Sequence, residues 1–395
     1  MPTVGAGTVN TEFEILTGMR QHDFGVSEYP YKTVLKSKTS ESICTDLKKL
    51  GYSTHAVHNN EATFYGRNTV FSNIGFDTFC SMEYMNGLTD SPNGWSNDDV
   101  LSREIMKTLD STSGPDFTMA ITVQSHGKYD GIALDDPTIK VTGAPEGKEQ
   151  AYEYYVNEIH EVDRMIDTLI KELSNRKEET VLVLYGDHLP SLDIQKDDLS
   201  NANLYQTQYV VWDNMNLKKK TKNLHAYQLY AEVLDRIQIH EGMITKYHQQ
   251  TKHRSKLYLT GLTTLSYDLL YGDNYAYDGK NPFKQTELQM GTEPVKLTSV
   301  QKTKSGYRVV GSGFTPYCKV YYDGTLVESE WISSECLQLQ DEFELDEADK
   351  KDSGEPETEV TEPRDVPNAF VVEVQSDDGV VLSSTQAYPA SQVKK

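Results

Sequence analysis

The segment Thr180-Val-Leu-Val-Leu-Tyr-Gly-Asp-His188 gives the clearest indication of the fold class. It begins as a mostly apolar run of the kind found in strands buried on both faces, and it ends in a turn that carries an aspartate and a histidine. Residues 149–173 precede it, and their apolar side chains recur at three- and four-residue spacing, as in an amphipathic helix. A long helix followed directly by a buried strand is typical of an α/β protein.

The same order of helix and strand occurs twice more upstream. Residues 40–50 predict a helix that leads into a strand at 52–57, and residues 100–109 predict a helix before a buried strand at 117–123. This alternation predicts a mainly parallel sheet with helices on both faces. In such sheets, binding sites gather at the carboxyl ends of the strands.

After about residue 290 the pattern changes to short alternating strands, for example 306–310 and 369–374, separated by glycine and aspartate turns. These strands predict a small β-sandwich of immunoglobulin-like type. We therefore expect two domains, at 1–290 and 291–395.

Composition narrows the classes of partner. The net charge is −22, which argues against nucleic acid, because like charges repel. Residues 341–365 hold 12 acidic and 3 basic side chains, a net charge of −9, and predict a solvated acidic loop. The four cysteines are too few and too scattered to predict a disulfide framework, and no pair has CxxC spacing. No apolar run of about 18 residues occurs, which predicts a soluble chain as given.

Two motifs suit metal-assisted chemistry. Adjacent Asp187 and His188 at a strand end can offer an oxygen and an imidazole to one divalent ion, although an ordinary aspartate-capped turn has the same sequence. Thr8 follows a glycine-rich loop at the start of a predicted helix. A hydroxyl there can lose its proton to a metal and attack phosphorus, yet a threonine near a helix N-cap is also common.

Two further motifs suit phosphate binding. His58, Tyr65 and Arg67 lie within ten residues, and the planar guanidinium of arginine can donate two hydrogen bonds to two oxygens at once. His126 follows the 117–123 strand. Each motif also has a plain structural explanation, as a polar surface loop in one case and a satisfied polar histidine in the other.

Together and in this order, the motifs resemble those of lipoteichoic acid synthases, which are sulfatase-like phosphoglycerol transferases of the alkaline phosphatase superfamily. The resemblance covers about residues 5–275. It includes Gly7-Thr-Val-Asn-Thr-Glu-Phe-Glu14, the block from His58 to Arg67, Thr122-Val-Gln-Ser-His126 and Tyr185-Gly-Asp-His188.

The resemblance implies a role for each of these residues. Thr8 would be the nucleophile and also a ligand, with Asp187 and His188, of a single divalent cation. That cation would be Mn²⁺, with Mg²⁺ and Zn²⁺ as alternatives. The side chains expected to line a glycerol-phosphate pocket are His58, Tyr65, Arg67 and His126. Tyr65 stands where the better-known members have tryptophan.

The implied reaction moves glycerol phosphate from a phosphatidylglycerol headgroup to a glycerol-phosphate polymer of the cell envelope, through a covalent intermediate on the threonine. The implied location is the extracellular face of a bacterial cell membrane, reached through N-terminal membrane helices. Those helices, and an acidic metal ligand at the end of a first strand, lie upstream of the nucleophile in the family and are missing here. The resemblance therefore implies a truncated, soluble fragment with an incomplete site.

Other functions stay open at this stage. A phosphodiesterase or phosphatase would use the same side chains to pass the intermediate to water. A catalytically impaired, wall-associated binding module would use the β-rich region to hold a polymer or protein. A sulfatase is disfavoured, because neither Cys44 nor Cys80 is followed by the proline and arginine that the modified cysteine of sulfatases requires.

Overall fold

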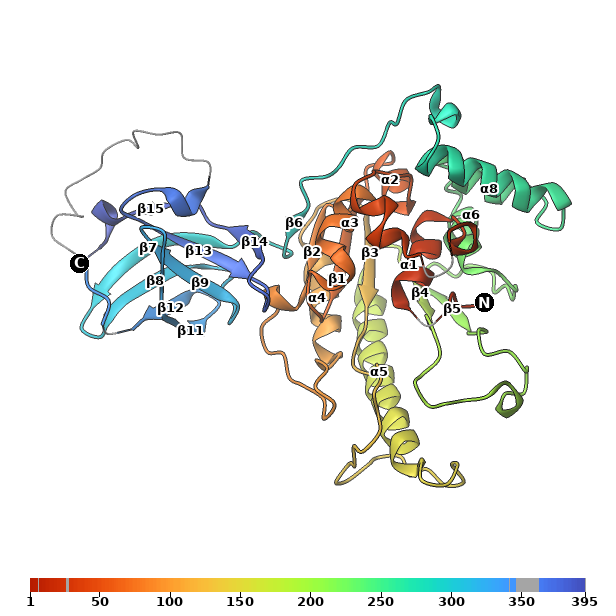
Figure 1. Cartoon of the computed structure of the whole chain (residues 1–395), viewed down its shortest axis with the longest axis horizontal. Coiled ribbons are helices and arrows are strands. Elements are labelled where there is room, and N and C mark those ends of the chain that lie inside the picture. The colour runs from red at the N-terminus through yellow and green to blue at the C-terminus, as the bar shows by residue number, and fades with distance from the viewer. Residues whose placement is uncertain (6, 26–27, 341, 346–361, 395) are drawn as a thin grey trace. The chain divides into compact units, whose positions relative to one another are not determined.

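The computed structural model describes residues 1–5, 7–25, 28–340, 342–345 and 362–394. The chain forms two compact units. The first comprises residues 1–56, 65–77 and 89–288, and the second comprises residues 57–64, 78–88 and 289–395 (Figure 1). Most of the predicted acidic loop at 341–365 lies outside the described residues.

The predicted α/β class is confirmed. Four strands form a sheet in the order β3-β1-β2-β6, and β6 runs parallel to β2. Their bounds are Ser53–His58 for β1, Thr78–Cys80 for β2, Asp116–Ile121 for β3 and Gln289–Met290 for β6. The helices around this sheet are α1 (Thr8–Thr17), α2 (Ile43–Lys48), α3 (Arg67–Asn73), α4 (Asp99–Asp110), α5 (Glu149–Asn175), α6 (Leu229–Arg236), α7 (Met243–Gln250) and α8 (Lys256–Leu270).

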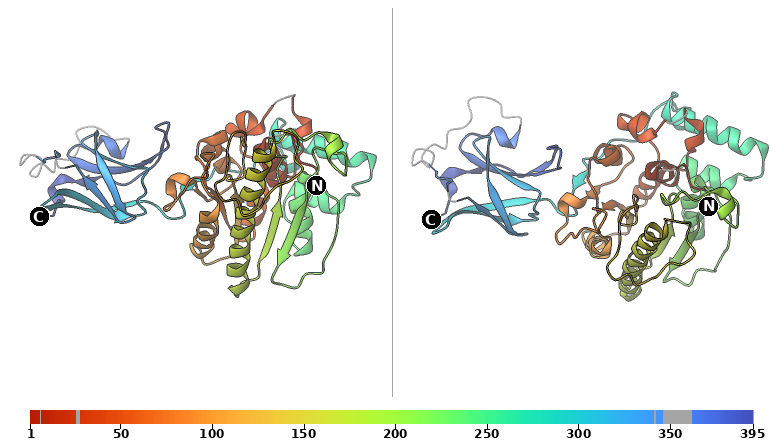
Figure 2. Two further views of the ribbon diagram at one scale, coloured as in Figure 1. Left: turned by 90° about the horizontal axis from the view of Figure 1, so that it is seen from below. Right: turned by 60° about the horizontal axis from the view of Figure 1, so that its bottom comes forward.

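Local sequence explains where these helices begin and how they pack. The Ser42 side chain accepts hydrogen bonds from the backbone of Cys44 and Thr45 and caps α2. Helix α1 ends at Gly18, which has a left-handed φ of 70° that glycine adopts without strain. Helices α4 and α5 pack side by side (Figure 2), and α4 also contacts β3. Among the described residues, no helix has both the length and the apolar character needed to cross a bilayer.

The strand before the Asp-His turn differs from its expected burial. Strand β4 (Val181–Tyr185) is half-buried along its whole length and pairs antiparallel with β5 (Tyr209–Asp213) in a separate two-stranded sheet. Strand β3 also leaves Ala120 exposed. Apolar composition alone does not distinguish a strand covered on both sides from one covered on a single side, so the expectation of full burial was wrong for both strands.

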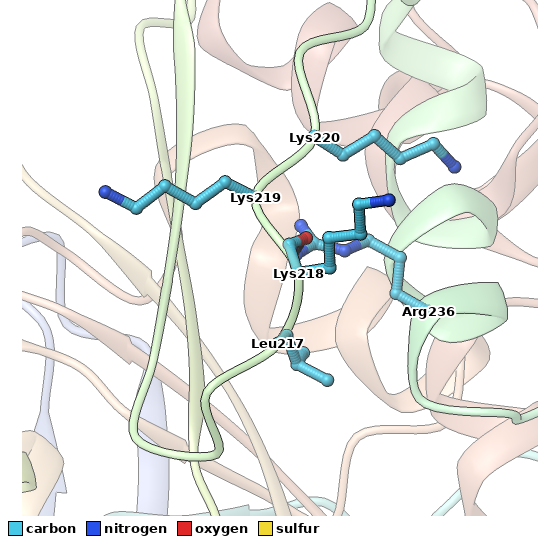
Figure 3. A pocket seen from close by; sticks show the side chains of 5 residues that line it. All are labelled: Leu217, Lys218, Lys219, Lys220 and Arg236. Carbon is cyan, nitrogen blue, oxygen red and sulfur yellow. Dashed lines mark hydrogen bonds between the residues drawn. The ribbon is translucent and has the colours of Figure 1, made fainter.

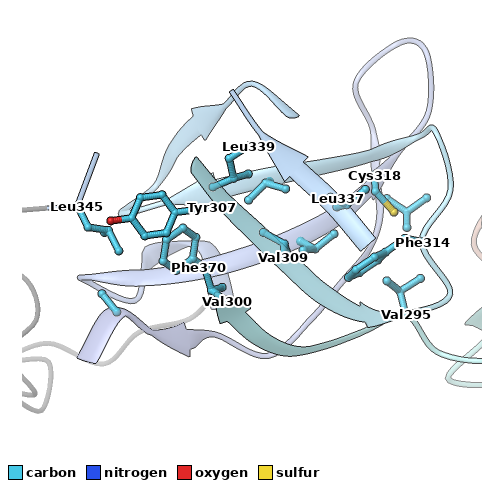
Figure 4. Packing of buried hydrophobic residues seen from close by; sticks show 14 residues of the cluster. Val295, Val300, Tyr307, Val309, Phe314, Cys318, Leu337, Leu339, Leu345 and Phe370 are labelled. Atoms are coloured by element: carbon cyan, nitrogen blue, oxygen red, sulfur yellow. The ribbon is translucent and has the colours of Figure 1, made fainter. Parts of the chain in front are cut away.

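The second unit contains the predicted β-sandwich. One sheet has the order β11-β12-β8-β7, and the other has the order β10-β9-β13-β14 with β15 also paired to β13. The strands are β7 (Lys296–Thr303), β8 (Gly306–Ser312), β9 (Cys318–Tyr322), β10 (Thr325–Val327), β11 (Ser329–Ser333), β12 (Cys336–Leu339), β13 (Ala369–Gln375), β14 (Val381–Ser384) and β15 (Tyr388–Pro389). Residues from both sheets share one core, in which Val309, Leu337 and Phe370 are fully buried (Figure 4).

A buried carboxyl group in α2 should make the stability of the fold depend on pH. Asp46 accepts a 2.6 Å hydrogen bond from the Thr245 hydroxyl, and Gly242 packs so closely that a Cβ there would overlap the carboxylate. Burial, together with the nearby charge of Glu41, raises the pKa of Asp46 from 3.8 to about 8. The folded state therefore holds the Asp46 proton more tightly than the unfolded chain does. As a result, the free energy of unfolding falls as pH rises from about 4 to about 8.

We expect Asp46→Asn to stabilise the first unit at pH 8, by about 1 kcal/mol or more, and to have much less effect at pH 5, because the neutral amide needs no proton. Thermal unfolding at both pH values measures this, with the exposed Asp136→Asn as the control. A variant that unfolds at a lower temperature than the wild type at pH 8 would contradict the assigned protonation.

Candidate active site

Thr8 is the first residue of α1, and it is partly buried. Gly7 is the N-cap, with extended backbone, and its carbonyl accepts the first helical hydrogen bond from the Asn10 N–H at 3.0 Å. A Cβ on Gly7 would lie 3.3 Å from the Tyr29 ring, so a larger residue would press on that ring. The backbone amides of the first turn and the helix dipole surround the Thr8 hydroxyl with partial positive charge.

Asp187 and His188 follow β4 and direct their donor atoms toward each other. The His188 backbone N–H donates to Asp187 Oδ1 at 2.9 Å, and His188 Nε2 lies 3.5 Å from Asp187 Oδ2. Two ligands bonded at about 2.1 Å to one ion lie about 3.0 to 3.4 Å apart, so this spacing suits a shared cation. His188 Nδ1 donates to the Leu189 carbonyl at 2.8 Å, which leaves Nε2 as the nitrogen with a free lone pair for a metal.

A hydrogen bond joins α1 to this turn. The buried Thr11 hydroxyl donates to the Asp187 carbonyl at 2.8 Å and accepts from the Val4 N–H at 3.0 Å. Thr8 lies three residues before Thr11, so the two side chains share one face of the helix. The nucleophile candidate and the two metal-ligand candidates are therefore attached to the same small region of the first unit.

His126 lies against His188. Their ring centroids are 5.9 Å apart and the rings are nearly perpendicular, while the Trp95 ring lies 5.0 Å from His126 on an edge-to-face contact. His126 Nδ1 donates to the Gly127 carbonyl at 2.8 Å, and Trp95 Nε1 donates to the same oxygen at 3.2 Å. The sequence analysis did not identify Trp95. It lies in a turn-rich loop, and no sequence pattern relates it to His126, which is 31 residues later.

Arg67 is buried rather than open to solvent, with 1% of its surface exposed. Its Nη2 donates to Glu12 Oε2 at 2.9 Å, and its Nε lies 3.3 Å from both carboxylate oxygens. Glu12 lies one turn after Thr8 in α1, and it too is 1% exposed. Arg67 therefore holds the nucleophile helix through a buried ion pair, a contact that the sequence did not predict.

Tyr65 lies over this ion pair. The Arg67 guanidinium carbon is 5.5 Å from the Tyr65 ring centre, and the ring stacks on Tyr29 with centroids 6.5 Å apart. Tyr65 has a left-handed φ of 61°, which is unusual for an aromatic residue and indicates a constrained position. Burial raises the pKa of the Tyr65 phenol, and the charge of Asp187 is among the further contributions.

His58 is the last residue of β1, is 3% exposed and belongs to the second unit. Its assignment to the glycerol-phosphate pocket therefore stays a prediction. A pocket of about 370 Å³ lies elsewhere, on a basic loop lined by Leu217, Lys218, Lys219, Lys220 and Arg236 (Figure 3). It contains no nucleophile or metal ligand, so it is not the candidate catalytic centre.

Within the described parts of the chain, no three His, Cys, Asp or Glu side chains form a metal cluster. Asp187 and His188 supply two suitable ligands, and the Thr8 hydroxyl is a third candidate. We expect His188→Ala to weaken Mn²⁺ binding by at least about tenfold, because it removes a nitrogen ligand. Calorimetric titration measures this, with His126→Ala as the control that keeps both ligands. Equal affinity in His188→Ala and wild type would remove the ligand assignment.

Comparison with known proteins defines the class. The sulfatase family matches residues 2–239, which is more than half of the chain, so the chain belongs to that family. Lipoteichoic acid synthase 2 of Bacillus subtilis (strain 168) is 24% identical over 199 residues, covering 49% of this chain and 30% of the relative. The predicted resemblance to sulfatase-like enzymes of the lipoteichoic acid synthase type, in the alkaline phosphatase superfamily, is confirmed.

Two other similar proteins extend this comparison. A putative cyclic β-1,2-glucan modification protein of Rhizobium meliloti (strain 1021) is 31% identical over 237 residues, covering 55% of this chain and 36% of the relative. The chain thus spans about a third of the length of these curated relatives. The solved structure of the Streptococcus pyogenes phosphoglycerol transferase GacH in complex with sn-glycerol-1-phosphate has a TM-score of 0.58 at 20% identity. It covers 72% of this chain and 79% of that one, and supports the fold.

Proposed function

We propose that this chain carries the catalytic site of a metal-dependent phosphoglycerol transferase, which moves glycerol phosphate from phosphatidylglycerol to a cell-envelope polymer. The observation that carries the proposal is the hydrogen bond from Thr11 to the Asp187 carbonyl, which attaches the Thr8 helix to the Asp187-His188 turn. The lipoteichoic acid synthases among its relatives and the phosphoglycerol transferase of similar fold support the same class of reaction.

In the first step, the Thr8 oxygen forms a bond to the phosphorus of the headgroup as the bond from phosphorus to the diacylglycerol oxygen breaks. Diacylglycerol leaves with a proton, and the glycerophosphoryl group stays on Thr8. In the second step, a hydroxyl of the acceptor attacks the same phosphorus, and Thr8 regains its proton. The amides at the start of α1 favour the negative charge on the phosphoryl oxygens in both steps, and His126 and Tyr65 border the glycerol.

The cation of this site would be held by Asp187, His188 and Thr8, with Mn²⁺ as the proposed ion. When bound, it supplies a Lewis acid that lowers the pKa of the hydroxyl and neutralises phosphoryl charge. The family resemblance implies one more acidic ligand of this cation.

The test uses the full-length gene product with fluorescent phosphatidylglycerol and Mn²⁺. We expect diacylglycerol to be released, and release to stop when EDTA removes the metal. No release, under conditions in which a lipoteichoic acid synthase is active, would overturn the proposal. We place the intact enzyme at the extracellular face of the membrane, where this lipid and the envelope polymer meet.

The same assay separates transferase from hydrolase. A phosphodiesterase would release free glycerol phosphate, whereas a transferase would label an acceptor only when one is supplied. The acceptors to compare are a glycerol-phosphate chain and a cyclic glucan, because one relative is named a glucan modification protein. Labelling of one of them identifies the acceptor class.

A further inference from the structure

A short turn places a lysine directly over two aromatic rings. Pro30–Lys32 form a 3₁₀ helix whose N-cap is Tyr29, and the Lys32 N–H donates to the Tyr29 carbonyl at 2.9 Å. Side chains three residues apart eclipse one another in a 3₁₀ helix, so Lys32 lies above Tyr29. The Lys32 Nζ is 5.4 Å from the centre of the Tyr29 ring and 5.3 Å from that of Tyr65.

The middle residue of this turn, Tyr31, is buried in the first unit. Tyr31 is 1% exposed, and burial together with the nearby Glu12 charge raises the pKa of its phenol well above the ordinary value. Tyr31 therefore anchors the turn next to the Arg67–Glu12 ion pair, while Lys32 stays exposed on the outer side. One face of the turn is structural, and the other presents a cation to solvent.

This cation lies next to the candidate active site. The Tyr29 ring lies beside Gly7, the residue before Thr8, because a Cβ added to Gly7 would come within 3.3 Å of a ring carbon. Tyr65, the other ring under Lys32, stacks on Tyr29, and the charge of Asp187 contributes in a minor way to the raised pKa of its phenol. The two rings thus connect Lys32 to both the nucleophile and the metal-ligand turn.

Binding a phosphodiester beside Thr8 requires positive charge in addition to that of Arg67. A phosphodiester brings a negative charge into a region that already holds Glu12 and Asp187. The Arg67 guanidinium is paired with Glu12, so much of its positive charge is compensated. Within the described residues, no carboxylate forms an ion pair with Lys32, and its ammonium has three N–H donors to offer.

We infer that Lys32, held over Tyr29 and Tyr65, forms an anion subsite that binds the phosphoryl oxygens of the substrate beside Thr8. This inference rests on the proposed function and deepens it, since it assigns phosphate recognition to a lysine of the Tyr29–Lys32 turn in addition to Arg67. The two rings limit where the flexible lysine chain can point, so less rotational freedom is lost when the phosphate binds.

The test compares Lys32→Met with Lys32→Arg and Lys36→Met in the full-length protein loaded with Mn²⁺. Methionine keeps an apolar stem over the rings and removes the charge, and Lys36→Met removes an equal charge from an exposed position four residues away. Binding of sn-glycerol-1-phosphate and of inorganic phosphate is measured by calorimetry. We expect Lys32→Met to weaken both ligands by about tenfold and by the same factor, because the lysine contacts the part they share.

Lys32→Arg should restore most of the affinity, and Lys36→Met should leave it within about twofold. In turnover of phosphatidylglycerol, Lys32→Met should raise KM and change kcat little, as expected for a contact made equally in the ground and transition states. Wild-type affinity and KM in Lys32→Met would overturn the subsite while leaving the proposed function intact. If the wild type neither binds sn-glycerol-1-phosphate in calorimetry nor turns over phosphatidylglycerol, both the subsite and the proposed function are overturned.

Discussion

Thr8→Ala is expected to reduce diacylglycerol release from phosphatidylglycerol by at least about a thousandfold, because no other accessible hydroxyl in the first turn of α1 can form the covalent intermediate. Thr11 lies one turn further on, but its hydroxyl is buried and hydrogen-bonded to Asp187 and Val4. The reaction should therefore depend on a single side chain of the helix.

Intact-mass spectrometry gives a second measurement of the same prediction. The wild type incubated with phosphatidylglycerol and Mn²⁺ should gain the mass of one glycerophosphoryl group, and peptide mapping should locate it at Thr8. Thr8→Ser keeps a hydroxyl at the helix start and should still form the adduct, so it serves as the matched control. An adduct that persists in Thr8→Ala would show that the nucleophile lies elsewhere.

The sequence predicted the parts of the site whose signals are local. The apolar strand followed by Asp187-His188, and Thr8 after a glycine-rich loop, each lie within one short segment, where strand and helix periodicity can be read directly. The alternation of helices and strands then placed these segments in an α/β fold, which the structure confirms. The identities of the candidate residues came from the family resemblance rather than from spacing alone.

Contacts between distant segments were not predictable in the same way. Arg67 and Glu12 are 55 residues apart, and nothing in either segment shows that this arginine is buried against a glutamate. The contact of Trp95 with His126 likewise joins two segments that are distant in the sequence. In both cases packing of the first unit decides which polar groups meet, and a single sequence carries no record of such pairs.

The Arg67–Glu12 pair leads to the largest expected effect on stability. Both side chains are 1% exposed, so removing either partner leaves a charge in a poorly hydrated place. We expect Arg67→Met and Glu12→Gln each to destabilise the first unit by about 3 to 5 kcal/mol. The sequence alone indicated a phosphate-binding role for Arg67, but the burial of its ion pair predicts that a substitution there lowers folding stability first.

The double variant Glu12→Gln/Arg67→Met separates folding from catalysis. Because it removes both charges, it should be about as stable as the wild type or lose much less than the sum of the single changes, which a double-mutant cycle on urea unfolding measures. Single variants that each cost under about 1 kcal/mol would mean that water reaches the pair. If the double variant folds, its remaining activity reports what Arg67 contributes to phosphate binding, since packing and the Thr11 hydrogen bond to the Asp187 carbonyl still hold α1.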